Sequence, residues 1–367
     1  MSLDSASLFQ PLEFPNGKVC PNRIMVAPLT NLQSEESGVM SEDEFNWLTM
    51  RAKGGFGITM TCASHVQKVG KGFPGQLGVF SDELLPGLKR LASEINKYGS
   101  LSMIQLHHAG VRTPKELIEE DPVSSSDVKK DDGSLAARGL SNGETLELID
   151  SFVEAAKRSE KAGFRGVQLH CAHGYILAQY ISKEFNKRAD EFGGSLENRS
   201  KIIFEILKRI KAECSPELIV SVRLSPEKFG MELDEVLWLS QKLIDSNLID
   251  FLDISLWDVF KKPEEIKLKD KLLIDYFSEL TWGNVKFVVA GKIHEPKDAL
   301  WCLEKGADFV ALGKMAILHH DYPNLVKEDP DFSPINTPVS KEYLENEGLG
   351  PKFISYMSNR WNNFVKE

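Results

Sequence analysis

Short apolar runs alternate with longer amphipathic stretches along most of this chain. Eight runs rich in β-branched residues end in small or polar residues, as buried strands do. They cover residues 23–30, 57–63, 101–107, 166–171, 218–224, 250–255, 286–291 and 308–313. Between them, apolar positions recur with the period of a helix at residues 41–53, 82–98, 144–162, 196–214, 233–246 and 295–305. Ser41 with Glu44, and Ser195 with Asn198, are typical helix-capping pairs.

Eight strands alternating with helices favour a closed (β/α)8 TIM barrel over an open doubly wound sheet. An open sheet that binds a dinucleotide would show G-x-G-x-x-G after its first strand, and this sequence has none there. We therefore predict one α/β domain, residues 1–367, with a barrel core at about 22–323 and a C-terminal tail at 324–367.

Two segments lie outside the alternation. The sequence Phe14-Pro-Asn-Gly17 predicts an N-terminal β-hairpin that closes the bottom of the barrel. The polar segment 113–143 predicts a long excursion after the third strand, which we expect at the rim of the active site.

Composition narrows the class of protein. The 367 residues are 42% hydrophobic, enough for a large core, and the formal net charge of −10 disfavours nucleic acid or anionic membrane as a partner. No apolar run approaches membrane-spanning length. The five cysteines form no C-x-x-C pair, which disfavours a zinc knuckle or an iron–sulfur cluster. Their odd number, with no apolar export segment before them, indicates a reducing, cytoplasmic location.

Candidate chemistry follows the fourth predicted strand, in the sequence His170-Cys-Ala-His173-Gly-Tyr175. Side chains at the carboxyl end of a parallel strand face the catalytic mouth of such a fold. Two neutral imidazoles can donate hydrogen bonds to a developing oxyanion, and a phenol can act as a general acid. The alternatives are a metal site at His170 and His173, and simple core packing of Tyr175. Because no His-x-His accompanies the first strand, we predict no metal.

Several motifs together resemble one known family. They are Asn22-Arg-Ile-Met-Val-Ala-Pro-Leu-Thr30, Gln105-Leu-His-His-Ala-Gly110, His170-x-x-His-Gly-Tyr175, the string at 192–199, Ser221-Val-Arg223 and Gly306-Ala-Asp-Phe-Val-Ala-Leu-Gly-Lys314. Each motif is weak alone, but their order, spacing and positions at strand ends are jointly specific. Over residues 8–323 the chain resembles the Old Yellow Enzyme family of FMN-dependent NAD(P)H oxidoreductases.

The resemblance implies a tightly bound FMN and assigns residues to it. The phosphate is expected in the loops after strands seven and eight, at Ala290, Gly291, Lys292, Gly313 and Lys314. The flavin ring is expected against Ala27, Pro28, Leu29, Thr30 and Ala63, with Gln105 at its pyrimidine side and Arg223 near N1 and O2. Lys314 stands where the family usually has arginine, so the positive charge is retained but the two parallel hydrogen bonds of a guanidinium group are lost.

The resemblance also implies an ene-reductase that works with NADH or NADPH. In that reaction His170 and His173 polarise the carbonyl or nitro group of an activated alkene, and Tyr175 protonates its α-carbon. The alternatives are a same-fold flavin dehydrogenase or oxidase acting on amines or other small molecules, and a non-catalytic flavin-binding barrel. By resemblance to the thermophilic-like bacterial members, we expect a homodimer or homotetramer with Arg360 reaching the neighbouring active site.

Three positions depart from the bacterial pattern. Thr30 and Leu32 stand where those members usually have cysteine and tyrosine, so the chain combines bacterial and classical features. The usual His-Ala-Gly-Arg is extended here to His108-Ala-Gly-Val-Arg112, and the resemblance therefore implies no role for Arg112.

Overall fold

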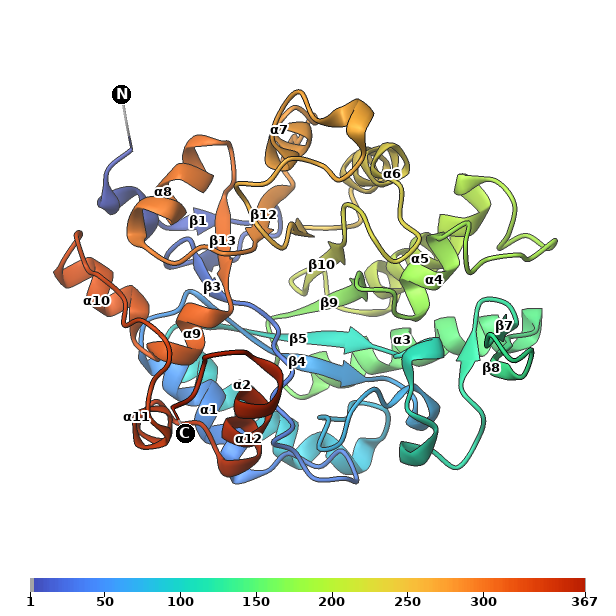
Figure 1. Cartoon of the computed structure of the whole chain (residues 1–367), viewed down its shortest axis with the longest axis horizontal. Helices are drawn as coiled ribbons and strands as arrows, with labels where there is room; N and C mark the ends of the chain where they lie inside the picture. The colour runs from blue at the N-terminus through green and yellow to red at the C-terminus, as the bar shows by residue number, and fades with distance from the viewer. Residues whose placement is uncertain (1–2, 367) are drawn as a thin grey trace.

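A closed barrel of eight parallel strands forms the centre of the protein (Figure 1). The computed structural model describes residues 3–366. The strands follow the chain order around the barrel: β3 (Ile24–Val26), β4 (Ile58–His65), β5 (Leu101–His107), β9 (Gly166–Cys171), β10 (Ile219–Leu224), β11 (Phe251–Ser255), β12 (Lys286–Ala290) and β13 (Phe309–Leu312). β13 pairs with β3 and closes the ring. The predicted TIM barrel is confirmed.

Helices cover the outside of the barrel (Figure 1). Six correspond to the predicted stretches: α1 (Glu42–Lys53), α2 (Leu85–Lys97), α3 (Asn142–Lys161), α5 (Leu196–Glu213), α6 (Leu233–Asp245) and α8 (Pro296–Glu304). The Ser41 and Ser195 hydroxyls accept the predicted capping hydrogen bonds. α3 begins two residues before the predicted start, because Ser141 and Glu144 form a capping box.

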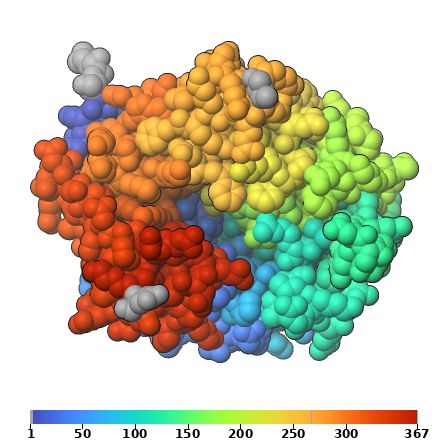
Figure 2. Space-filling model, in the orientation of Figure 1, coloured from blue at the N-terminus to red at the C-terminus, as the bar shows by residue number. Residues whose placement is uncertain are grey.

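Several short helices, in the connections between the strands and in the tail, were not predicted. They are α4 (Ile176–Ile181), α7 (Leu273–Ser278), α9 (Lys314–Leu318), α10 (Tyr322–Glu328), α11 (Lys341–Asn346) and α12 (Pro351–Arg360). In the tail, the Phe353 ring of α12 packs edge-on against Trp47 of α1, with ring centres 5.1 Å apart. Figure 2 shows a hollow near the middle of one face, bordered by the red C-terminal tail. No helix within residues 3–366 is long and apolar enough to cross a membrane.

The N-terminal hairpin closes the bottom of the barrel, as predicted. Its strands are β1 (Leu12–Glu13) and β2 (Val19–Cys20), and Gly17 turns the chain with a φ of 79°. Phe14 is buried between the first residues of two barrel strands. Its ring lies 5.7 Å from that of Phe309 and 5.9 Å from that of Phe251.

The excursion after β5 folds into a small three-stranded sheet, formed by β6 (Val123–Ser124), β7 (Val128–Lys129) and β8 (Leu135–Gly139). The Ser124 and Ser125 hydroxyls donate hydrogen bonds to Gln179 of α4 at 3.0 Å each. None of residues 113–143 lines the two cavities at the mouth, and a role for this segment in the rim stays a prediction. Backbone pairing within the small sheet, and its hydrogen bonds to α4, fix the position of this segment.

Phe14→Ala tests the closure of the barrel bottom. Because the Phe14 side chain is buried between Phe251 and Phe309, we expect the substitution to lower the free energy of unfolding by about 3–5 kcal/mol. Urea denaturation followed by circular dichroism measures it. Val19→Ala in the same hairpin is the control, because that side chain is 53% exposed. Equal losses of stability in the two variants would contradict this account of the hairpin.

Candidate active site

Two adjoining cavities lie at the mouth of the barrel, where the strands end. Their volumes are about 390 and 210 Å³, and they share Pro28, Leu29, His173, Arg223 and Trp361 as lining residues. Predicted site residues that line only the larger cavity are Ala27, Ala290, Gly291, Lys292, Gly313 and Lys314. Those that line only the smaller cavity are Thr30, Ala63, Gln105, His170 and Tyr175. The fold therefore brings every predicted site residue except Arg360 to this mouth.

The two histidines and the tyrosine form one cluster in the smaller cavity. The ring centre of His170 lies 5.0 Å from that of His173 and 4.9 Å from that of Tyr175. His170 lies on β9 and His173 in the turn that follows it, where its φ is 58°, and both imidazoles line the cavity. Nε2 of His173 is 2.9 Å from the Ser255 hydroxyl. Nδ1 of His170 is buried and has no hydrogen-bond partner among the described residues.

Burial controls the charge of this cluster. It lowers the pKa of both His170 and His173 well below the usual value for histidine, and the positive charges of Arg223 and Arg112 lower it further. Both imidazoles are therefore neutral at neutral pH, and each carries one N–H donor. The cluster can stabilise negative charge on a ligand oxygen without itself being charged.

A chain of buried polar side chains crosses the barrel below this cluster. Gln105 Nε2 donates to Gln168 at 2.7 Å, and Gln168 Nε2 donates to the Asp253 carboxylate at 3.3 Å. Arg223 Nε lies 3.3 Å from the same carboxylate, and Arg223 Nη2 donates to Ser255 at 3.3 Å. Burial raises the pKa of Asp253, while Arg223 opposes this shift. The carboxylate thus helps to hold the Arg223 guanidinium at the mouth.

Some buried polar atoms of this chain remain without partners. Nε of Arg223 has none among the described residues, because its 3.3 Å contact with Oδ2 of Asp253 lacks hydrogen-bond geometry, and Oδ1 of Asp253 has none either. Buried polar atoms are normally hydrogen-bonded, so exceptions at a cavity need an explanation. The polar edge of a flavin ring, placed between Gln105 and Arg223, would supply an acceptor for Nε of Arg223, whereas Oδ1 of Asp253 would need a donor.

The loops after β12 and β13 form a cradle at the other end of the larger cavity. Gly291 has a φ of 141°, and a Cβ there would lie 2.5 Å from the backbone of Trp257. Lys292 is paired with Asp258 at 2.9 Å. Lys314 donates to the Thr337 hydroxyl at 3.1 Å and contacts no carboxylate within residues 3–366. A glycine turn beside an unneutralised ammonium group suits a phosphate, so the residues present fit FMN.

The C-terminal tail contributes side chains that the sequence analysis did not assign to the site. Tyr356, Met357 and Trp361, at the end of α12, line the smaller cavity of their own chain. Arg360 is exposed and lines neither cavity. Its contact with a neighbouring subunit stays a prediction. The motif around Arg360 was recognisable, but its packing over the mouth depends on the folded tail.

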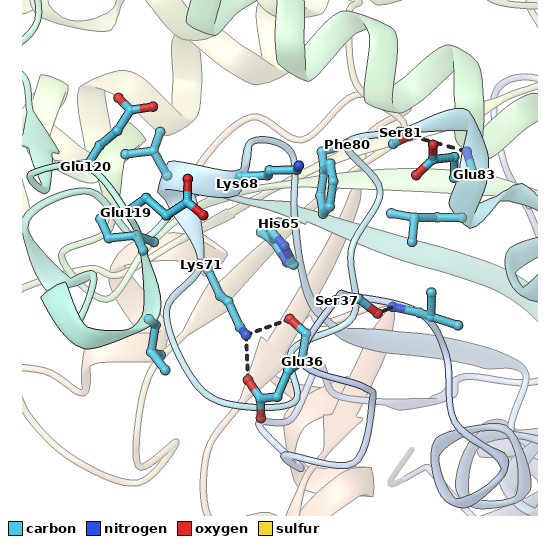
Figure 3. A pocket seen from close by; sticks show the side chains of 15 residues that line it. Glu36, Ser37, His65, Lys68, Lys71, Phe80, Ser81, Glu83, Glu119 and Glu120 are labelled. Atoms are coloured by element: carbon cyan, nitrogen blue, oxygen red, sulfur yellow. Dashed lines mark hydrogen bonds and ion pairs between the residues drawn. The ribbon is translucent and has the colours of Figure 1, made fainter.

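A separate cavity of about 380 Å³ is lined partly by the end of β4 and the loop that follows it (Figure 3). There Lys71 Nζ contacts the Glu36 carboxylate at 2.6 Å and its carbonyl oxygen at 2.8 Å. His65 contacts the Leu77 carbonyl at 3.0 Å, and burial lowers its pKa to about 4. This cavity shares no lining residue with the two at the mouth. Because Lys71 and His65 are already partnered within the protein, we place the candidate active site at the mouth.

No group of three histidine, cysteine, aspartate or glutamate side chains converges on one point in the described part of the chain. His170 and His173 instead neighbour Tyr175 and Ser255, which are not the ligands of a typical zinc site. The histidine pair therefore suits an organic oxygen better than a metal ion.

Comparison with known proteins gives a consistent family assignment. Residues 7–331 match the NADH:flavin oxidoreductase / NADH oxidase family. A probable NADH-dependent flavin oxidoreductase of Bacillus subtilis is 36% identical over 329 residues, which are 88% of this chain and 88% of the relative. An NADH:acrylate oxidoreductase of Vibrio harveyi is 29% identical over 93% of this chain, but the match spans only 35% of that longer relative.

A solved structure shows the same architecture. The Old Yellow Enzyme homologue from Zymomonas mobilis superposes with a TM-score of 0.79 and 26% identity, covering 95% of this chain and 98% of the other. The family match extends through the barrel and the strand ends that carry the mouth residues. The chain therefore belongs to the NADH:flavin oxidoreductase / NADH oxidase family, in the Old Yellow Enzyme group, and is an NAD(P)H-dependent FMN oxidoreductase.

Proposed function

We propose that this enzyme reduces activated C=C bonds, in α,β-unsaturated carbonyl compounds and nitroalkenes, at the expense of NADH or NADPH. The observation that carries the proposal is the pair of neutral imidazoles, His170 and His173, beside the phenol of Tyr175 in one cavity. Two hydrogen-bond donors and one acid are what the addition of hydride and a proton across an activated alkene requires.

The proposed reaction assigns a task to each member of the cluster. His170 and His173 bind the carbonyl or nitro oxygen and stabilise the negative charge that develops there. FMN, which Arg223, Gln105 and Lys314 would hold, would supply the hydride chemistry that links the nicotinamide to the β-carbon of the alkene. Tyr175 gives its proton to the α-carbon and regains one from water. The alkene thus gains one hydride and one proton, while NAD(P)H is oxidised to NAD(P)⁺.

The remaining mouth residues would hold FMN. Lys314 and the turns at Gly291 and Gly313 suit its phosphate, because they combine a cation with close backbone approach. Arg223 is placed to stabilise negative charge on the polar edge of the ring, and Gln105 to hydrogen-bond the same edge. The backbone from Ala27 to Thr30, with Ala63, offers a surface with few bulky groups for the ring plane.

Two alternatives are less well supported by the site. The oxidation of an amine would not require the two neutral hydrogen-bond donors, His170 and His173, that line this cavity. A barrel that only binds flavin does not explain why His170, His173 and Tyr175 lie together. The relative named for acrylate, an unsaturated carboxylate, also agrees with an alkene as the electron acceptor.

Lys314→Ala tests the phosphate site. The substitution removes a charge-assisted contact, which we expect to weaken FMN binding by about 1.5–3 kcal/mol. Fluorescence titration of the apoprotein with FMN measures the dissociation constant. Lys292→Ala is the matched control, because Lys292 is already paired with Asp258 and should contribute less. A purified protein that releases FAD on heating would contradict the assignment of FMN.

Phenols test the oxygen site. A phenolate oxygen resembles the developing enolate, so para-substituted phenols should bind the oxidised protein and produce a long-wavelength charge-transfer band. The double variant His170→Ala/His173→Ala should lose this band, as measured by visible absorbance titration. Unchanged phenol binding in the double variant would show that these histidines do not form the oxygen site.

Tyr175→Phe tests the proton donor. The variant keeps the packing of the ring and removes only the hydroxyl, so flavin reduction by the nicotinamide should proceed at a nearly native rate. Reoxidation by 2-cyclohexenone should slow by about 10²–10⁴-fold, the usual loss when a general acid is removed. Stopped-flow absorbance resolves the two phases. If flavin reduction slows as much as enone turnover, Tyr175 positions ligands and is not the acid.

A further inference from the structure

The cations around the mouth fall into two groups. Three of them lie beside a carboxylate: Arg223 with Asp253 at 3.3 Å, Lys292 with Asp258 at 2.9 Å and Lys228 with Glu264 at 2.9 Å. No carboxylate in residues 3–366 lies within ion-pair distance of Lys314 or Arg112. The phosphate of FMN accounts for Lys314, but nothing in the proposed reaction so far accounts for Arg112.

Arg112 lies directly against the catalytic cluster. Its Nη1 donates a hydrogen bond to the backbone carbonyl of His173. The guanidinium carbon is 4.9 Å from the ring centre of Tyr175 and 5.5 Å from that of Phe229. The residue is otherwise exposed and lines neither cavity itself, so it lies at the edge of the mouth, where a ligand can reach it. Arg112 thus presents a positioned, unneutralised guanidinium beside the proposed proton donor.

The turn that carries Arg112 is locked to the catalytic loop by Gln179, which is fully buried. Nε2 of Gln179 donates to the carbonyl of Gly174 at 2.8 Å and to that of Ala109 at 3.3 Å. Its Oε1 accepts from the backbone N–H of Val111 at 3.3 Å. One buried amide therefore fixes the turn before Arg112 relative to the residues between His173 and Tyr175. Such support is expected for a binding group and not for a freely solvated surface arginine.

We propose that Arg112 binds a carboxylate on the α-carbon side of the substrate, so that the enzyme selects activated alkenes that carry a second, anionic group. This inference rests on the proposed function. If Tyr175 protonates the α-carbon, that carbon lies beside the Tyr175 hydroxyl, and a substituent one or two bonds longer reaches toward the guanidinium. The activating carbonyl remains on His170 and His173, while the planar fork of Arg112 accommodates the carboxylate.

A matched pair of substrates tests the inference. Dimethyl itaconate is neutral, whereas the half-ester with a free carboxymethyl group carries a carboxylate on the α-carbon side. We expect Arg112→Gln to lower the ratio of kcat/KM for the half-ester to that for the diester by about 10- to 100-fold, the usual range for a lost charge-assisted contact. Arg112→Lys, which keeps the charge without the fork, should retain part of the preference.

Lys228→Gln is the matched control. It removes one positive charge from the same rim, but that charge already faces Glu264, so the ratio should stay unchanged.

A second measurement does not depend on turnover. The inhibition constant of the saturated half-ester, which does not react, should rise by a similar factor in Arg112→Gln and stay unchanged in Lys228→Gln.

Three results would overturn the inference. Equal losses with both esters would show that Arg112 positions Tyr175 and His173. A higher KM for the nicotinamide in flavin reduction, without a change in the ester ratio, would assign the guanidinium to the phosphates of the dinucleotide. If the wild-type enzyme is reduced by NADH or NADPH but reduces neither ester nor 2-cyclohexenone, the proposed function fails and this inference fails with it.

Discussion

Closure of the barrel is the constraint on which the site depends. β13 and β3 come from opposite ends of the chain, and their pairing completes a ring in which all eight strands point the same way. Every strand then delivers its carboxyl end to one mouth. Histidines at the end of β9, an arginine on β10 and a lysine after β13 meet at this mouth although they are far apart in the chain. The pairing of β13 with β3 brings the backbone from Ala27 to Leu29, which follows β3, beside the phosphate cradle.

Burial at this mouth determines which groups are charged. It makes His170 and His173 neutral, because an imidazolium in a poorly solvated cavity beside Arg223 is unfavourable. The same burial makes an isolated Arg223 charge unfavourable, and Asp253 on the neighbouring strand β11 offsets that cost. The mouth therefore combines neutral donors for a substrate oxygen with fixed positive charge for the cofactor. These two requirements conflict in water and become compatible only in a partly dry, preorganised site.

The barrel and the His170–Tyr175 cluster could be predicted from local patterns, whereas most of the flavin-site residues were predicted only through the resemblance to the Old Yellow Enzyme family. Strand ends, helix periods and the hairpin turn are set by residues close together in the chain. Gln168, Asp253 and Ser255 were not predicted as site residues. Gln168 lies two positions before His170, and Asp253 lies two positions before Ser255, so each pair faces the same side of its strand. Fully buried strands hide this alternation, because apolar residues occupy both faces. The short α4 is also too brief for a helical period to be visible.

The placement of Tyr356, Trp361 and Arg112 follows from tertiary structure alone. The first two reach the mouth only because α12 folds back over its own barrel, and no local pattern specifies that path. One extra residue shifts Arg112 from its usual place in the motif, so the resemblance implies no role for it. In the fold, a left-handed Gly110, with a φ of 64°, and the amide of Gln179 bring the displaced side chain back against Tyr175. An insertion that breaks a motif can thus move a charged group to a new position at the same site. Its chemistry is then determined by the neighbours it acquires, and for Arg112 these are aromatic rings and a backbone carbonyl that leave its charge unneutralised.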